Sequence, residues 1–206
     1  MSDSQQPTGR DPVDDVVKAA RNSREAFGQL FDHFYPPIFA YCSRRLLVRA
    51  VAEDVTSEVF LKIAAHFCDF SGETAEDFRR WIFRIATNEI NARLRQTIRQ
   101  RELLEAAARM GQVNSAVSTP LLSSDFPVDW EDVVQALTEL SEREQSIISL
   151  RFFAGLQHDQ IAAVLDVEAG TCRVALTRAL SKLRDRLQDH EDPIRSAPET
   201  ERGGQS

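Results

Sequence analysis

The chain has 206 residues, enough for one large domain or two small ones, and its 42% hydrophobic content is ordinary for folded proteins. No apolar run approaches the roughly 18 residues that a membrane helix needs, and the opening residues, MSDSQQPTGR, lack the basic and apolar parts of a signal peptide. These features argue against a membrane protein, a secreted protein and a chain that is disordered throughout. We therefore expect a cytoplasmic protein.

Apolar residues recur at helical spacing along nearly the whole chain, and sustained alternation is absent, so we predict an all-α fold. Residues 1–20 are polar and are predicted to be a disordered tail. An apolar stripe follows from Phe27 to Cys42, and Pro36-Pro37 inside it predict a kink or a break into two helices. The next stripe, from Val55 to Phe67, ends at a loop rich in serine, glycine and threonine.

A third helix is predicted to begin near Glu76 and to run to about Arg109, with apolar residues such as Phe78 and Ile82 facing inward. We expect residues 21–109 to form one helical domain. Small and polar residues with two prolines then predict a flexible linker over residues 110–128.

The second predicted domain covers residues 129–188 and carries sharper helix signals. Ser141 followed by Glu144 is a capping box, which places a helix start at Ser141. The segment HDQIAAVL predicts a short helix, and a tight connection leads to a longer helix from Thr171 to Leu187. A short helix, a brief turn and a long basic helix indicate a helix-turn-helix domain. Residues 189–206 are predicted to be a second disordered tail.

Positive charge is concentrated in two segments, although the net charge is −7. The first segment has one acid, Glu89, and seven arginines: Arg79, Arg80, Arg84, Arg93, Arg95, Arg99 and Arg101. The second, residues 169–187, has five basic residues against Asp185. Two compact basic segments on an acidic background are typical of two contact sites for a polyanion. The alternative is that these arginines only form solvated helix faces.

The segment AEDVTSEVFLKI, which begins at Ala52, has a polar face opposite its apolar stripe. This face carries Asp54, Ser57, Glu58 and Lys62. Asp54 and Glu58 are four residues apart and repel each other in a helix, so a purely structural helix gains nothing from the pair. The face is either an ordinary solvated surface or a contact surface for a partner.

No catalytic constellation is evident in the sequence. The histidines are scattered, and only His66 and Cys68 hint at a metal pair, which is too few ligands for a site. Glycine-rich phosphate loops and nucleophile motifs are absent. We therefore predict no enzyme activity, no catalytic residue, no metal, no cofactor and no small-molecule substrate. The three cysteines, Cys42, Cys68 and Cys172, are expected to be buried thiols.

In this order and at this spacing, three segments resemble the sigma-70 family of bacterial RNA polymerase sigma factors, in its extracytoplasmic-function (ECF) group. AEDVTSEVFLKI resembles region 2.2, FRRWIFRIATNEINARLRQ resembles regions 2.3 and 2.4, and the stretch from LTELSERE to RALSKL resembles region 4. The resemblance implies a protein that binds core RNA polymerase, reads the −35 element of promoter DNA as duplex and reads the −10 element as it melts. An anti-sigma factor is a further expected partner.

The resemblance also implies roles for particular residues. The face of Asp54, Ser57, Glu58 and Lys62 would dock on the polymerase, with Ser57 where the family usually has glutamine. Candidates for the −10 element are Thr87, Asn88 and Asn91 at base edges, with Arg79, Arg80, Arg84, Arg93 and Arg95 on phosphates. Candidates for the −35 element are Thr171, Arg173, Thr177 and Arg178. We expect Trp81 to pack in the core.

Two other functions remain open at this point. The helix-turn-helix also resembles that of response-regulator-type transcriptional activators, which would place an α/β domain upstream of it. A helical adaptor that does not bind DNA is the second alternative, and it would lack salt-dependent affinity for DNA.

Overall fold

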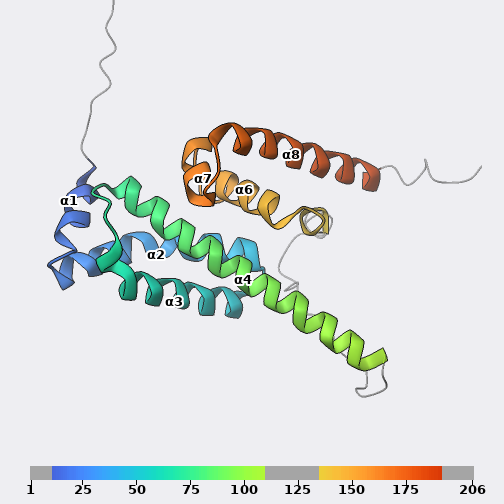
Figure 1. Ribbon diagram of the computed structural model, residues 1–206, viewed down its shortest axis with the longest axis horizontal. Coiled ribbons are helices and arrows are strands. Elements are labelled where there is room, and N and C mark those ends of the chain that lie inside the picture. The colour runs from blue at the N-terminus through green and yellow to red at the C-terminus, as the bar shows by residue number, and fades with distance from the viewer. Residues whose placement is uncertain (1–10, 110–134, 192–206) are drawn as a thin grey trace, which may run out of the picture.

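The computed structural model describes residues 11–109 and 135–191, and within these ranges the chain is built of helices without any strand (Figure 1). The all-α prediction is therefore confirmed. The predicted linker, the first half of the predicted N-terminal tail and most of the predicted C-terminal tail lie outside the described residues.

The described helices form two groups along the chain (Figure 1). The first group comprises α1 (Pro12–Ala19), α2 (Arg24–Leu46), α3 (Arg49–His66), a 3-10 turn η1 (Phe67–Asp69) and α4 (Ala75–Arg109). The second comprises α6 (Glu142–Phe152), α7 (His158–Leu165) and α8 (Ala169–Glu191). We call them the first and second bundles. α4 is the longest of these helices, and its C-terminal part projects beyond the first bundle.

Helix α1 corrects the predicted extent of the N-terminal tail. Residues 12–19 are helical rather than disordered, because Asp11 caps the helix by accepting from Val13 N at 3.0 Å and Val17 is fully buried. The helix also holds the start of α4, where Asp14 Oδ1 accepts from Ala75 N at 2.7 Å. This bond supplies a partner to one of the amides that a helix start leaves open.

Helix α2 is continuous through Pro36-Pro37, so of the predicted kink or break, the break into two helices does not occur. A proline inside a helix removes one backbone hydrogen bond, but the flanking residues Phe34 and Ile38 are buried and anchor the chain on both sides. Tertiary packing thus outweighs the local penalty. The helix ends at Leu47, which has a left-handed φ of 60° and donates its N–H to Ser43 O.

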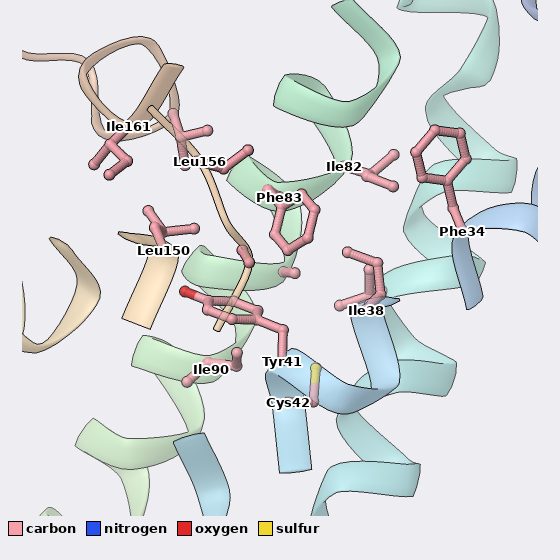
Figure 2. Packing of buried hydrophobic residues seen from close by; sticks show 14 of the residues in the cluster. Phe34, Ile38, Tyr41, Cys42, Ile82, Phe83, Ile90, Leu150, Leu156 and Ile161 are labelled. Atoms are coloured by element: carbon pink, nitrogen blue, oxygen red, sulfur yellow. The ribbon is translucent and has the colours of Figure 1, made fainter. Parts of the chain in front are cut away.

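An aromatic and aliphatic core holds the first bundle together. Phe34 packs edge-on against Phe78 with ring centroids 5.0 Å apart, and Ile82 lies beside Phe34 and Ile38 (Figure 2). Trp81 packs on Phe70 with a centroid distance of 5.0 Å, which confirms the expected packing role of its ring.

The second bundle confirms the strongest helix signals of the sequence. Both halves of the capping box at Ser141 and Glu144 are present, Gly155 has a left-handed φ of 68°, and α7 and α8 form the predicted helix-turn-helix. Two apolar side chains of this bundle point to solvent: Phe152 is 57% exposed, and Val174 of α8 is 51% exposed.

The apolar cores of the two bundles meet. α4 packs against α7, and α2 packs against α6. Phe83 is fully buried and lies between Tyr41 of its own bundle and Leu156 of the other (Figure 2). The adjacent residue Ile82 points to the other side of α4, toward α2 and α3, so α4 has one apolar face for each bundle.

Candidate nucleic-acid interface

The N-terminal half of α8 presents the candidate −35 surface. Cys172, Leu176 and Ala179 are buried and fix this half of the helix on the bundle. The four candidate residues lie on the exposed side: Thr171, Arg173, Thr177 and Arg178. In the described part of the chain neither Arg173 nor Arg178 forms an ion pair, so both guanidinium groups are available for phosphates or base edges.

The C-terminal half of α8 uses its charges differently. Lys182 donates to Glu144 Oε1 at 2.7 Å, and Arg186 lies 2.6 Å from Glu139 Oε2. The Lys182 side chain is the main reason that the pKa of Glu144 is lowered. These pairs hold α8 against α6 and the residues just before it, so Lys182 and Arg186 have a structural role that Arg173 and Arg178 do not share.

The face of α4 that carries the −10 candidates is turned toward the second bundle. Thr87 is 2% exposed; its hydroxyl donates to Phe83 O at 2.7 Å and lies 3.1 Å from Tyr41 Oη. Asn91 is 8% exposed and donates to Ser146 Oγ of α6 at 3.3 Å. Both residues are candidates for base contact from the family resemblance, and the structure places both side chains inside.

The long arginine side chains of this face reach across to the second bundle. Arg79 donates to the carbonyl of Ala154, in the turn between α6 and α7. Arg95 Nη1 donates to both carboxylate oxygens of Glu142, at 2.7 and 2.8 Å, and Arg84 Nη2 lies 3.6 Å from Asp166 Oδ1.

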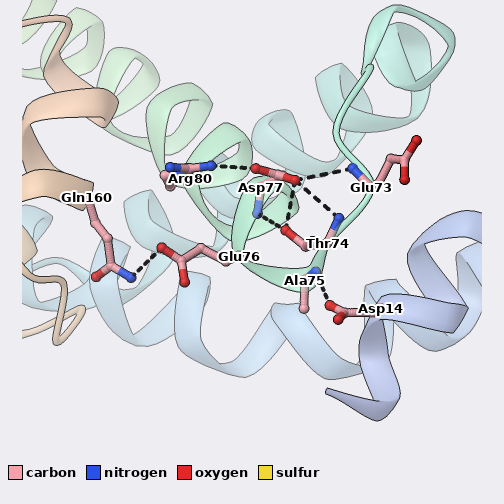
Figure 3. Close-up of polar contacts among 8 residues, drawn as sticks. All are labelled: Asp14, Glu73, Thr74, Ala75, Glu76, Asp77, Arg80 and Gln160. Atoms are coloured by element: carbon pink, nitrogen blue, oxygen red, sulfur yellow. Dashed lines mark hydrogen bonds and ion pairs between the residues drawn. The ribbon is translucent and has the colours of Figure 1, made fainter. Parts of the chain in front are cut away.

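The other −10 candidates have different surroundings. Arg80 pairs with Asp77 of its own helix, which caps the start of α4 through Thr74 (Figure 3). Asn88 is exposed, and Arg93 is half-buried. Of the eight −10 candidates, only Asn88 is exposed and forms no hydrogen bond or ion pair with the second bundle among the described residues.

Arg45 of α2 is a central polar residue that the sequence reasoning missed. Its Nη1 donates to Gln145 Oε1 at 2.7 Å, its Nη2 donates to Asn91 Oδ1 at 3.1 Å, and its Nε is buried without a partner among the described residues. Burial lowers its pKa, and the opposing influence of Tyr41 and Glu142 does not cancel this. The nearest signal in the sequence is the pair Arg44-Arg45 next to apolar residues, which does not reveal partners so far along the chain.

Tyr41 completes the buried polar group beneath α4. Burial raises its pKa to about 12, against the opposing effect of its hydrogen bond with Thr87. The phenol is therefore neutral near neutral pH and serves as a hydrogen-bonding group.

A cavity of about 460 Å³ lies between α4 and the second bundle. Its lining includes Arg84, Asn88 and Asn91 from α4 and Arg143 and Asp166 from the second bundle. The interface between the bundles is thus polar and incompletely packed at this edge, unlike the apolar contact around Phe83.

The polar face of α3 lies away from these contacts. Asp54, Ser57 and Glu58 are exposed, with Ser57 Oγ donating to Glu53 O at 2.9 Å. Lys62 Nζ donates to Glu89 Oε1 of α4 at 2.6 Å, which ties α3 to the basic helix. Three of the four candidate polymerase contacts are therefore free of ion pairs in the described structure.

The structure also shows the surroundings of the three cysteines and of His66. Cys42 and Cys172 are buried as expected, and burial raises the pKa of Cys42 to about 11. Cys68 is exposed, so the expectation of a buried thiol is wrong there. His66 lies 3.2 Å from Asp69, and no group of three potential metal ligands occurs within residues 11–109 and 135–191.

Each of the two bundles matches a protein-family model. Residues 30–100 match the model for Sigma-70 region 2, and residues 130–183 match the model for Sigma-70 region 4. The chain belongs to the sigma-70 family of RNA polymerase sigma factors. It is a sigma factor of the ECF group, and such proteins bind core RNA polymerase and direct promoter recognition when transcription begins.

Several similar proteins are ECF sigma factors. BldN of Streptomyces coelicolor is 27% identical over 84% of this chain, which spans 65% of the length of BldN. SigW of Bacillus subtilis is 25% identical, with 84% of this chain and 95% of SigW covered. The ECF sigma-E factor of Haemophilus influenzae is 28% identical, with 84% and 93% covered.

Solved structures show the same fold. The sigma factor RpoE of Bartonella quintana, in complex with the anti-sigma factor NepR, has a TM-score of 0.57 at 23% identity and covers 79% of this chain and 96% of its own. CnrH, in complex with the cytosolic domain of CnrY, has a TM-score of 0.61 at 22% identity and covers 87% and 99%. In the described part of this sigma factor, none of the helices has the length and apolar character needed to cross a membrane.

Proposed function

We propose that this sigma factor reads the −35 element with the N-terminal half of α8. The observation that carries the proposal is the pair of exposed guanidinium groups, Arg173 and Arg178, on the second helix of a helix-turn-helix, free of acidic partners. Side chains at the start of such a helix enter the major groove, where arginine can bind guanine with two hydrogen bonds. Thr171 and Thr177 lie on the same exposed side and can donate to phosphates or bases.

For the −10 element we propose Asn88 and Asn91 as base contacts and the arginines of α4 as phosphate contacts. Asparagine can both donate to and accept from the edge of an unstacked base, whereas guanidinium attracts phosphate without regard to sequence. Thr87 is not carried forward, because both of its hydrogen bonds are used inside the first bundle. The phosphate candidates are Arg79, Arg80, Arg84, Arg93 and Arg95.

The exposed face of α3 is the proposed docking surface for core RNA polymerase, through Asp54, Ser57, Glu58 and Lys62. An anti-sigma factor is a further proposed partner, since the two solved structures above are complexes with such proteins or domains. We propose a cytoplasmic protein that acts without enzymatic activity of its own, and without a cofactor or small-molecule substrate.

Run-off transcription with core polymerase and genomic DNA tests this function. The wild-type chain is expected to create start sites that core polymerase alone does not use, and mapping these sites gives the promoter. No enrichment of start sites over core alone would contradict the function. A response-regulator-type activator or an adaptor would give that result, and the match to region 2 in place of an α/β domain already speaks against the activator.

Two substitutions in α8 test the −35 assignment. Arg173→Ala should weaken binding to the mapped promoter by about 1–3 kcal/mol and relax the base preference at one −35 position. Arg184→Ala is the matched control, because Arg184 is an exposed arginine about three turns further along the same helix. Equal effects of the two substitutions on affinity and base preference would show that α8 contributes only general charge.

A further inference from the structure

Val174 lies at the centre of the exposed face of α8. Successive residues of a helix are about 100° apart, so Val174 lies on the side opposite Cys172 and Ala179, which are buried. Its side chain is 51% exposed. The next residue, Ala175, is half-buried and packs against the core. The proposed −35 surface therefore has an aliphatic side chain at its middle.

The neighbours of Val174 on this face leave it accessible to a duplex. Arg173 precedes it in the chain and Arg178 lies one turn further on, and neither forms an ion pair in the described part of the chain. One turn earlier, Gly170 has no side chain, and a Cβ at that position would have open space around it among the described residues. Residues near the start of such a helix face base edges in the major groove. A duplex held by the two arginines would thus present a base edge to Val174.

An aliphatic side chain in the major groove is matched by only one of the four bases. Every base pair presents hydrogen-bond donors and acceptors there, and thymine alone adds an apolar group, its C5 methyl. Valine has neither a donor nor an acceptor in its side chain. Against a G·C pair it would displace water from polar base atoms without replacing their hydrogen bonds, which costs free energy. Against thymine, the contact of methyl groups buries apolar surface on both partners.

We propose that Val174 is a specificity-determining residue that selects a thymine in the −35 element by contact with its C5 methyl. This inference rests on the proposed reading of the −35 element by α8, and it adds the base that one position of this element requires. Arg173 and Arg178 hold the duplex, whereas Val174 distinguishes an A·T pair from a G·C pair at the position opposite its side chain. The −35 elements mapped by run-off transcription should therefore share an A·T pair.

Replacement of thymine by uracil tests this contact, because uracil lacks only the C5 methyl. Each thymine of the mapped −35 element, on either strand, is replaced in turn, and holoenzyme assembled from core polymerase and the full chain is titrated with the promoter duplexes. The wild type should bind about fourfold less tightly when one particular thymine is replaced, which corresponds to about one buried methyl group. Uracil at the other thymines should leave the affinity nearly unchanged.

The substitution Val174→Ala should remove the discrimination between thymine and uracil. The position is exposed and alanine favours helix, so the fold should be kept. The variant should bind the thymine duplex about fourfold less tightly than the wild type does, and it should bind the thymine and uracil duplexes equally. Leu180→Ala is the matched control, because Leu180 is an aliphatic residue that is 37% exposed and lies about 120° around the same helix. This control should keep the full discrimination.

Equal affinity of the wild type for every uracil-substituted duplex would overturn the proposal, and this measurement decides even if a variant fails to fold. The proposal would also be refuted by mapped −35 elements without a shared A·T pair, or by a Val174→Ala variant that keeps the wild-type discrimination. If Arg173→Ala weakens binding while no thymine responds to replacement, only the role of Val174 fails. If Arg173→Ala also leaves binding unchanged, the assignment of α8 to the −35 element fails as well.

Discussion

The two arginine-bearing faces of this sigma factor differ in what covers them. On α8, Arg173 and Arg178 are exposed and have no acidic partner in the described structure. On α4, Arg79, Arg84 and Arg95 contact the second bundle, and Arg80 pairs with Asp77 of its own helix. Both segments are basic in sequence, but only on α4 does a second bundle engage the arginines. Positive charge therefore indicates where nucleic acid can bind, and the packing of the bundles decides which arginines have protein partners in this structure.

Removal of Phe83 should have the largest effect on the packing that covers the face of α4. Phe83→Ala deletes a fully buried ring between the two bundles, and such substitutions cost about 3–5 kcal/mol of unfolding free energy. The expected result is a lower thermal midpoint and separate unfolding of the two bundles, measured by calorimetry. Phe152→Ala, at a position that is 57% exposed, is the control and should cost about 1 kcal/mol or less. Similar losses for both would mean that the ring of Phe83 is not a shared core residue.

Removal of both unpaired arginines of α8 tests whether the exposed surface of this helix binds DNA. The variant R173A/R178A is expected to lose about 2–4 kcal/mol of binding to a −35 duplex and to lower the salt dependence by about two counterions. Binding titrations at several salt concentrations measure both quantities. A variant with unchanged salt slope would place these side chains away from the phosphates.

Loss of the Tyr41 hydroxyl should have a moderate effect on the face of α4. Tyr41→Phe removes the hydrogen bond with Thr87 and is expected to lower the free energy of unfolding by about 1 kcal/mol. Chemical denaturation at neutral pH measures this. A neutral or stabilising result would show that the hydroxyl of Thr87 is satisfied by Phe83 O alone.

A substitution at the start of α4 should have the smallest effect on the free energy of unfolding, and this effect should depend on pH. Asp77 accepts from Glu73 N, Thr74 N and Thr74 Oγ1 (Figure 3), and the bond from Thr74 is the main reason that its pKa is lowered. Asp77→Ala should cost about 0.5–1 kcal/mol at neutral pH. Because the folded pKa is depressed, this stability is fully present above the unfolded pKa of about 4 and is lost as pH falls through the lower, folded pKa. A wild-type advantage that does not decrease as pH falls from about 7 through this range would contradict the assignment.

The sequence predicted the local structure well because its signals act over a few residues. The capping box at Ser141 depends on residues only three apart, and it appears as expected. At Pro36-Pro37 the local rule allowed a kink or a break, and burial of neighbouring side chains keeps α2 continuous. Local rules are reliable where no distant contact competes with them.

The contact between the bundles could not be predicted in the same way. Arg45 binds Asn91 and Gln145, which are 46 and 100 residues further along the chain. Asn91 reads as an exposed polar residue on a basic helix until Ser146 of α6 is placed beside it. Such burial depends on long-range packing. Helical periodicity is a local signal and does not identify a partner from another bundle.

Arginine-specific chemical modification followed by mass spectrometry tests the central claim most directly. In the free sigma factor, Arg173 and Arg178 are expected to react quickly, whereas Arg45 and Arg79 are protected by the second bundle. Equal reactivity of all four residues in the free protein would contradict the claim that one face is open and the other covered.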